Sequence, residues 1–124
     1  MKKSAVVAAL ALIFFVAAAV LPVATVAVAT PPSKYTKQED VTSQLVKGVG
    51  SFSVTVYKLH EGRTMSYAST SQCWSVPSQE GYEYWSELTA KDGAGAYGRY
   101  LSIVWGIPGS ESRTWKLLSF NSTN

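Results

Sequence analysis

The side chains that could carry out catalysis are few in this sequence. His60 is the only histidine and Cys73 the only cysteine. A catalytic nucleophile needs a neighbouring base and a group that orients the base, and neither residue has such a set around it in the sequence. His60 adjoins Glu61 at an expected turn, so we interpret it as a solvated surface residue. The sequence therefore favours a binding or structural role over an enzyme.

Three carboxylates are spaced three and four residues apart, at Glu80, Glu83 and Glu87. On a helix this spacing would place them on one face, but the aromatic residues between them favour a strand with a solvated edge. His, Cys and carboxylate residues nowhere show the spacing of a metal site. Residues 92–96 (Asp-Gly-Ala-Gly-Ala) lack the lysine and hydroxyl of a phosphate loop. We expect them to form a plain loop.

One cysteine excludes an intrachain disulfide, so the fold must depend on its core. We interpret Cys73 as a buried, small apolar side chain. The alternatives are a bridge to another chain, or a cysteine whose partner is missing from a shortened chain. Thirteen of the 15 aromatic residues follow residue 29, and aromatic side chains bury large areas. A short chain could close a core in this way.

The secondary-structure elements predicted from the sequence, which would position these residues, indicate an α+β domain. Alternation over 51–59 predicts a strand with Phe52, Val54 and Val56 on one face. Further strands are predicted over 82–88, 100–105 and 113–120, with loops at 92–96 and 106–109. A short helix is predicted over 63–73. Residues 30–50, with two consecutive prolines and charges of both signs, are expected to form an extended polar linker.

The N-terminus is typical of a secretory signal peptide. Lys2 and Lys3 precede an uncharged, Ala- and Val-rich run that ends in Ala27-Val28-Ala29. Small residues at these two positions suit signal peptidase, so residues 1–29 are predicted to be removed. A second small-residue triplet allows cleavage after Ala19 instead. The run is also long enough for an uncleaved membrane anchor, although Pro22 and the alanine content favour cleavage.

Secretion changes the interpretation of the charge. The whole chain carries a net charge of +3. Without Lys2 and Lys3, nine basic residues face eight acidic ones, which argues against a nucleic-acid partner. Asn121-Ser122-Thr123 is a sequon, so Asn121 is a candidate glycan acceptor in a eukaryotic secretory pathway. We expect an extracellular protein that contacts a membrane only if the leader is retained.

The C-terminal half resembles a known domain. Residues 98–103 read Gly-Arg-Tyr-Leu-Ser-Ile, Gly106-Ile107 follows, and residues 114–118 read Thr-Trp-Lys-Leu-Leu. This order is similar to the C-terminal β-domain of the cobalamin carriers transcobalamin, intrinsic factor and haptocorrin. The resemblance covers about residues 51–120, and 51–124 is the corresponding domain. It implies a β-grasp-like sheet with one short helix.

The same resemblance implies a ligand and a site. In the carriers, a Trp-x-Leu segment lies against cobalamin, and Trp115, Lys116 and Leu117 match it. Read without the resemblance, Trp115 is a core tryptophan on a strand, and Lys116 alternates to the opposite face of that strand. The carriers also have a helical barrel and a further terminal strand pairing that this chain lacks, so we expect an unpaired sheet edge.

Two functions follow from these expectations. The first is a secreted module that binds a small ligand, with cobalamin or another corrinoid as the candidate. The alternative is a secreted structural or protein-interaction domain that has lost the ligand, with a protein partner completing the sheet or the site by strand addition.

Overall fold

The computed structural model describes residues 28–111 and 114–123. Nearly all of the predicted signal peptide therefore lies outside the described residues. The elements are, in chain order, β1 (Lys37–Gln38), α1 (Gln44–Glu61), β2 (Met65–Ser78), β3 (Gly81–Asp92), β4 (Tyr97–Gly106) and β5 (Lys116–Ser122). The strands form one antiparallel sheet in the order β1-β2-β3-β4-β5. The α+β prediction is confirmed.

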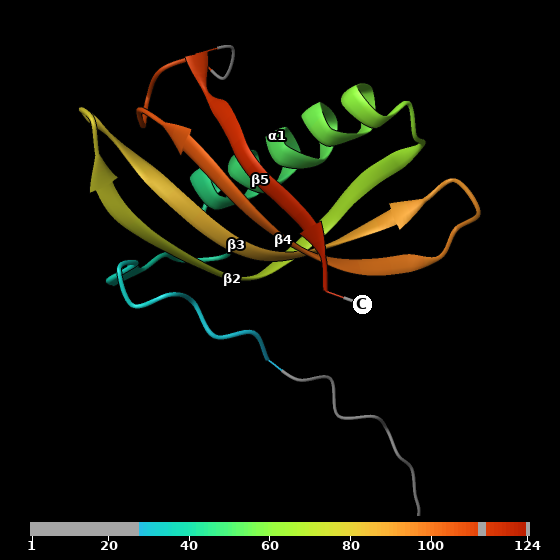
Figure 1. Ribbon diagram of the computed structural model, residues 1–124, viewed down its shortest axis with the longest axis horizontal. Coiled ribbons are helices and arrows are strands. Elements are labelled where there is room, and N and C mark those ends of the chain that lie inside the picture. Colours follow the sequence, from blue (N-terminus) through green and yellow to red (C-terminus); the bar gives the residue numbers. More distant parts are fainter. Residues whose placement is uncertain (1–27, 112–113, 124) are drawn as a thin grey trace, which may run out of the picture.

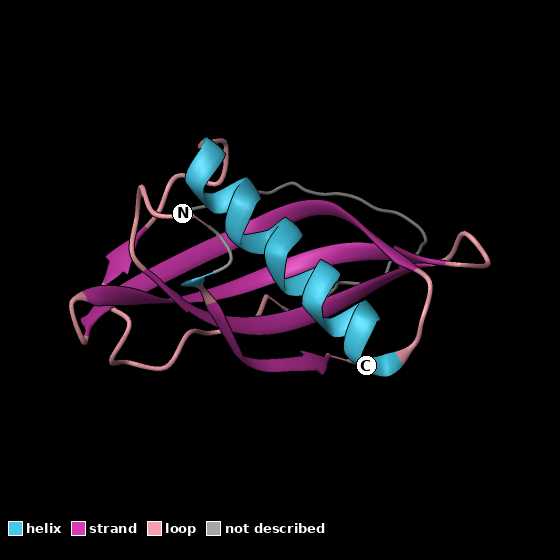
Figure 2. Cartoon of the chain, turned by 90° about the horizontal axis from the view of Figure 1, so that it is seen from above, coloured by secondary structure: helices cyan, strands magenta, loops and turns pink. Residues whose placement is uncertain are grey.

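Helix α1 crosses one face of the sheet diagonally (Figure 2). It begins after Ser43, whose side chain accepts a hydrogen bond from the Val46 N–H at 3.2 Å. It ends at Gly62, which adopts the left-handed conformation with φ of 66°. In the described part of the chain, we find no helix with the length and apolar character needed to cross a membrane.

The strand predicted over 51–59 is wrong, because these residues form the second half of α1. Alternating β-branched residues there mimic a strand locally. The helical pattern appears only when the sequence is examined from Leu45 onward. The positions that α1 buries then follow the i, i+3, i+4, i+7, i+8 spacing of one helix face: Val46, Val49, Gly50, Ser53 and Val54. The helix starts seven residues before Ser51, within the stretch that we interpreted as a linker.

The helix predicted over 63–73 is also wrong, because this stretch lies mostly in β2. Strand β2 contains two register shifts against β3, between Tyr67 and Ser69 and between Thr70 and Gln72. Each shift inserts one residue, so the spacing between residues on the helix side becomes three instead of two. Tyr67, Thr70 and Cys73 thereby imitate a helical period.

The remaining strand predictions are confirmed. Strand β3 contains the predicted 82–88, β4 contains 100–105, and β5 covers 116–120 of the predicted 113–120. The turn between β2 and β3 has positive φ at both central residues, Gln79 and Glu80. This backbone suits the right-handed twist of the two strands.

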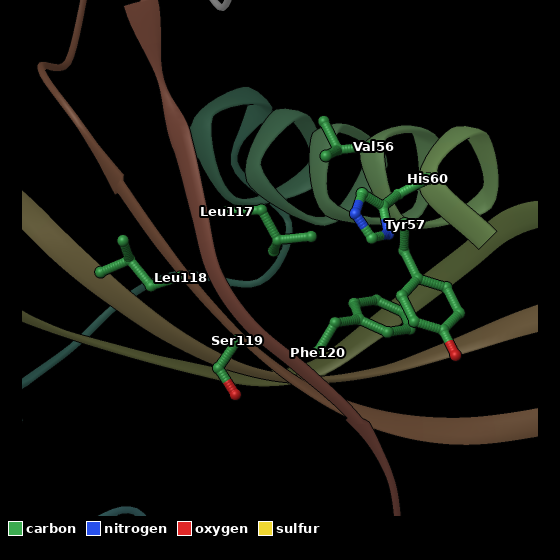
Figure 3. Close-up of a pocket in the computed structure, with 7 residues that line it drawn as sticks. All are labelled: Val56, Tyr57, His60, Leu117, Leu118, Ser119 and Phe120. Carbon is green, nitrogen blue, oxygen red and sulfur yellow. The ribbon is translucent and has the colours of Figure 1, made fainter.

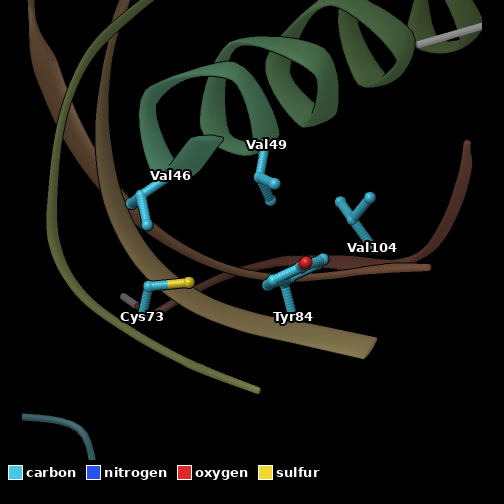
Figure 4. Close-up of a cluster of buried hydrophobic side chains, with 5 residues drawn as sticks. All are labelled: Val46, Val49, Cys73, Tyr84 and Val104. Carbon is cyan, nitrogen blue, oxygen red and sulfur yellow. The ribbon is translucent and has the colours of Figure 1, made fainter. Parts of the chain in front are cut away.

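The core lies between α1 and the sheet (Figure 4). One cluster consists of Val46, Val49, Cys73, Tyr84 and Val104. A second cluster consists of Val54, Met65, Leu88 and Ala90. The buried position predicted for Cys73 is confirmed. Its sulfur accepts a hydrogen bond from the Ser86 hydroxyl at 3.4 Å, and burial raises the pKa of the thiol to about 11.

The segment from residue 28 to β1 passes over the opposite face of the sheet (Figure 1). Tyr35 is buried there and donates a hydrogen bond from its hydroxyl to Glu83 Oε1 at 3.0 Å. Burial, with Glu83 adding to it, raises the pKa of Tyr35 to about 12. On this face Trp85 and Glu87 are also buried. The N-terminal segment is therefore packed against the domain.

Candidate functional site

The predicted site residues do not share one side of the sheet. Trp115 and Leu117 pack with the cluster under α1, whereas the Lys116 ammonium lies 6.0 Å from the ring centre of Trp105. Lys116 is exposed, and it pairs with Trp105 in the ladder between β4 and β5. Alternation along the strand separates Lys116 from the other two, as the sequence predicts.

Trp115 is held in place from three sides. Its indole meets Phe52 of α1 edge to face, with ring centres 5.7 Å apart. Its Nε1 donates to the Ser110 hydroxyl at 3.2 Å. Its ring also lies against Gly106, where a Cβ would come within 2.7 Å of the indole. The core interpretation of Trp115 is confirmed in part, since the ring packs on the core but is not fully covered. Its contact with a ligand stays a prediction.

Two hollows follow the seam between α1 and β5. The first has a volume of about 310 Å³ and is lined by Gly48, Ser51, Phe52, Thr55 and Trp115. The second has a volume of about 250 Å³ and is shown in Figure 3; it is lined by Val56, Tyr57, His60, Leu117, Leu118, Ser119 and Phe120. We call the two hollows together the α1/β5 seam.

The far end of the seam is aromatic. Phe120 stacks between Tyr57 and Tyr100, with ring centres 4.2 and 5.0 Å away. His60 stands above this stack on the last turn of α1 (Figure 3). Its side chain is 83% exposed, and its Nδ1 lies 3.2 Å from Glu61 Oε2. The prediction of a solvated His60 is confirmed, although it lies on a helix and not at a strand end.

The lining residues of the seam determine what it can bind. Apolar and aromatic side chains predominate, and hydroxyls come from Ser51, Thr55, Tyr57 and Ser119. None of the twelve described lining residues is a carboxylate, and His60 is the only one that can carry a positive charge. Across residues 28–111 and 114–123, no group of three or more His, Cys, Asp or Glu residues could hold a metal ion.

Strand β5 forms the edge of the sheet next to the seam. Within the described ranges it pairs with β4 and with no other strand. The ladder shifts register between Ile103 and Val104, which leaves Leu118 as an extra residue on β5. Leu118 is 51% exposed and points away from Leu117 (Figure 3). It borders both the seam and a third hollow, of about 210 Å³, on the other face.

The three spaced carboxylates lie on or next to β3, as a strand interpretation requires. Glu80 lies in the turn before β3, while Glu83 and Glu87 share the sheet face opposite α1. Glu87 is buried and forms an ion pair with Arg99. The expected solvated edge is therefore wrong for Glu87. Its burial depends on the N-terminal segment, which no local pattern around β3 reveals.

Asn121 is an exposed residue near the end of β5. Its Nδ2 donates to the Ser119 hydroxyl at 2.9 Å. Thr123, the third residue of the sequon, is tied to β4 through its N–H and its hydroxyl, which both donate to the Arg99 carbonyl. Glycosylation at Asn121 stays a prediction.

Comparisons with known proteins identify no family for this chain: no family model matches it, and neither does any curated protein sequence.

Proposed function

We propose that this protein is a binding module that takes up an extended segment of another polypeptide along β5. The observation that carries the proposal is the position of the α1/β5 seam, which runs directly beside the edge strand of the sheet. In strand addition, main-chain hydrogen bonds to an edge supply affinity, and pockets for alternate side chains supply specificity. Strand β5 offers the edge for main-chain hydrogen bonds, and the seam offers the pockets for side chains.

The ladder between β4 and β5 shows which residues could pair. The Thr123 N–H donates to the Arg99 carbonyl at 3.0 Å. In an antiparallel ladder, hydrogen-bonded and non-hydrogen-bonded pairs alternate. The pairs at Asn121 and Ser119 are therefore hydrogen-bonded to β4, and the backbone groups of Phe120 turn toward the free edge. The bulge at Leu118 confines regular pairing with a partner to 119–122.

The seam also restricts the chemistry of the partner segment. Its hollows lie on one side of β5, so they suit apolar side chains at alternate positions of an added strand. The lining residues that the structure describes include no carboxylate that could receive a lysine or arginine. Lys116, which is exposed at the start of β5, can receive an acidic residue. We propose a partner segment with alternating apolar residues, no basic residue facing the seam, and an acidic residue at the end near Lys116.

A selection from displayed nine-residue peptides tests this function. Peptides would be selected on the wild-type domain only, and their dissociation constants would then be measured on the wild type and on Leu118→Lys, which puts a charge on the edge. Tyr97→Lys is the matched control, because Tyr97 is 65% exposed at the start of β4. We expect peptides with the alternating pattern, a dissociation constant raised at least tenfold by Leu118→Lys alone, and amide shifts centred on 119–122. Peptides that bind all three proteins equally would contradict the proposal.

A corrinoid is the second candidate, because the hollow at Trp115 contains an indole in the position that the resemblance assigns to ligand contact. Pockets that enclose drug-sized ligands have volumes of about 300–1,000 Å³. Neither hollow is large enough to enclose a corrin, so the ring would have to lie over the seam and bind weakly. The resemblance to the β-grasp-like domain of the cobalamin carriers is an argument for the corrinoid function only.

Cobalamin titration distinguishes the two candidates. The corrinoid function predicts a saturable change in visible absorbance and tryptophan fluorescence, which Trp115→Phe weakens and Trp74→Phe leaves intact. Trp74 lies on the other face of the sheet, paired with Trp85. If a folded sample shows no change at millimolar protein, only the polypeptide-binding function is left.

We also propose that the module acts outside the cell. The charged start and small-residue end of the leader support this location, as does the exposure of Asn121. Mass spectrometry of the protein from a secreting eukaryotic host tests both features, since it reports the N-terminal residue and any glycan together. An intact Met1 would instead indicate a retained anchor.

A further inference from the structure

A buried carboxylate holds the chain at the point where the leader is predicted to end. Glu87 is 2% exposed and lies on the sheet face opposite α1. Its Oε1 accepts hydrogen bonds from Gln72 Nε2 at 3.0 Å and from the Ser71 hydroxyl at 3.3 Å. Its Oε2 faces Arg99 and accepts from the Ala29 N–H at 3.3 Å. Three elements therefore converge on this carboxylate.

Ala29 is held at both of its backbone groups. While its N–H points to Glu87, its carbonyl accepts a hydrogen bond from Gln72 Nε2 at 2.6 Å. The segment that follows is fixed again at Tyr35, whose hydroxyl binds Glu83. Both anchor points lie on the sheet face opposite α1, and the segment runs along that face in Figure 1. The methyl side chain of Ala29 does not explain why a buried carboxylate binds at this position, since only backbone groups of Ala29 take part.

The predicted processing would remove this residue. Signal-peptidase hydrolysis between Ala29 and Thr30 adds the hydroxyl of water to the Ala29 carbonyl carbon. The C–N bond breaks, both protons of that water end on the Thr30 nitrogen, which becomes an α-ammonium, and Ala29 leaves as a carboxylate. Glu87 then loses the N–H of Ala29 as a donor, and Gln72 loses an acceptor. A buried carboxylate that loses a partner favours any positive group able to reach it.

We propose that the α-ammonium of Thr30 takes the place of the Ala29 N–H on Glu87, so that Glu87 is the receptor for the mature N-terminus. The proposal rests on the predicted cleavage after Ala29. One residue of extended chain spans at most about 3.6 Å, so the Thr30 nitrogen has about that distance to cover to reach the position of the Ala29 nitrogen. An ammonium offers three donors where a peptide N–H offers one, and its hydrogen bonds to a carboxylate are charge-assisted.

The charges around the site accommodate this exchange. Arg99 faces Oε2 from β4, and its side chain is 26% exposed. Gln72 and Ser71 approach Oε1 from β2 and are neutral. The ammonium would therefore share Oε2 with Arg99, as the Ala29 N–H does, on the side from which the chain already arrives. Processing would thereby fix the new N-terminus on the sheet through its ion pair with Glu87.

The test begins with the full chain expressed in a secreting eukaryotic host. Mass spectrometry of the secreted protein is expected to give Thr30 as the first residue. The acylation rate of its α-amine is then measured in wild type, Glu87→Gln and Glu83→Gln. We expect at least tenfold slower acylation in wild type than in Glu87→Gln. Glu83→Gln is the matched control, since Glu83 holds the same segment at Tyr35, and it should behave as wild type.

A second measurement needs no variant, in case Glu87→Gln does not fold. The wild-type α-amine is acylated in the native protein and in urea at the same pH. A held ammonium reacts at least tenfold more slowly in the native protein. A different first residue, or equal acylation rates in the native and unfolded protein, would overturn the proposal.

Discussion

The indole of Trp115 meets the ring of Phe52 at an interplanar angle of 72°, and this contact joins the start of β5 to the middle of α1. An edge-to-face pair of this kind is worth about 0.5–1.5 kcal/mol beyond the area that it buries. The same indole forms one wall of the α1/β5 seam. The shape of the proposed binding site therefore depends on a contact that also stabilises the fold.

Two glycines of α1 are expected to respond in opposite ways to alanine. A Cβ at Gly48 would meet nothing within 4 Å, whereas one at Gly50 would lie 2.5 Å from the Tyr67 ring and 2.9 Å from the Thr70 hydroxyl. Because alanine is favoured over glycine in a helix by about 1 kcal/mol, Gly48→Ala should raise the free energy of unfolding by up to that amount. Gly50→Ala should lower it by about 1–3 kcal/mol through overpacking. Urea unfolding measures both, and equal effects would contradict the close approach of α1 to β2.

Two buried serines on the helix side of the sheet should also differ. Ser102 Oγ is buried and has no hydrogen-bond partner among the residues that the structure describes, whereas the Ser86 hydroxyl donates to Cys73. Burying an unbonded hydroxyl costs about 1–3 kcal/mol. We therefore expect Ser102→Ala to leave the free energy of unfolding unchanged or to raise it by about 1 kcal/mol. Ser86→Ala should lower it by about 0.5–1 kcal/mol. A marked loss for Ser102→Ala would show that its hydroxyl has a partner in solution.

The ion pair between Glu87 and Arg99 should be strongly coupled. In the chain that keeps Ala29, Arg99→Met leaves the Glu87 carboxylate buried without its cation, which costs about 3 kcal/mol by analogy with other buried pairs. Adding Glu87→Met should recover at least half of that loss, since no buried charge is then left. Lys34→Met is the exposed comparison: Lys34 Nζ lies 3.2 Å from Glu83, and its side chain is 60% exposed. It should cost about 1 kcal/mol at most. Strictly additive effects of Arg99→Met and Glu87→Met would contradict the coupling.

Stability should fall at alkaline pH. Burial raises the pKa of Cys73 from 9.0 to about 11 and that of Tyr84 from 10.0 to about 12. Between the unfolded and folded pKa values the folded chain binds more protons than the unfolded chain, so stability decreases as pH rises. The stabilisation from Cys73 is complete below pH 9 and is lost as the pH rises through 11. Urea midpoints at pH 7, 9, 10 and 11 should show this decline, with a shallower slope in Cys73→Ala. A flat profile above pH 9 would contradict the burial of these groups.

The sequence predicts the central hairpin of the sheet well. Strands β3 and β4 combine local alternation with clear turn residues at their ends, and both signals are short-range. The bulges of β2 defeat the same reasoning, because they replace the period of two by a spacing that mimics a helix between Tyr67 and Cys73. The missed helix has a signal that could have found it. Ser43 before Leu45 and Gly62 after Glu61 are ordinary helix boundaries.

By itself, the sequence determined the α+β class, the burial of Cys73 and the separation of Lys116 from Trp115 and Leu117. The burial of Cys73 follows from its residue type, and the separation of Lys116 follows from alternation along one strand. The α+β class is correct although its helix was predicted over 63–73 and lies over 44–61. Only the tertiary structure decided that Trp115 meets Phe52, that the seam runs beside β5, and that Glu87 is buried beneath residues near Ala29. Such contacts join residues that are 58 positions apart for Ala29 and Glu87 and 63 positions apart for Phe52 and Trp115. No local periodicity encodes them, because they arise when separate elements pack on the two faces of one sheet.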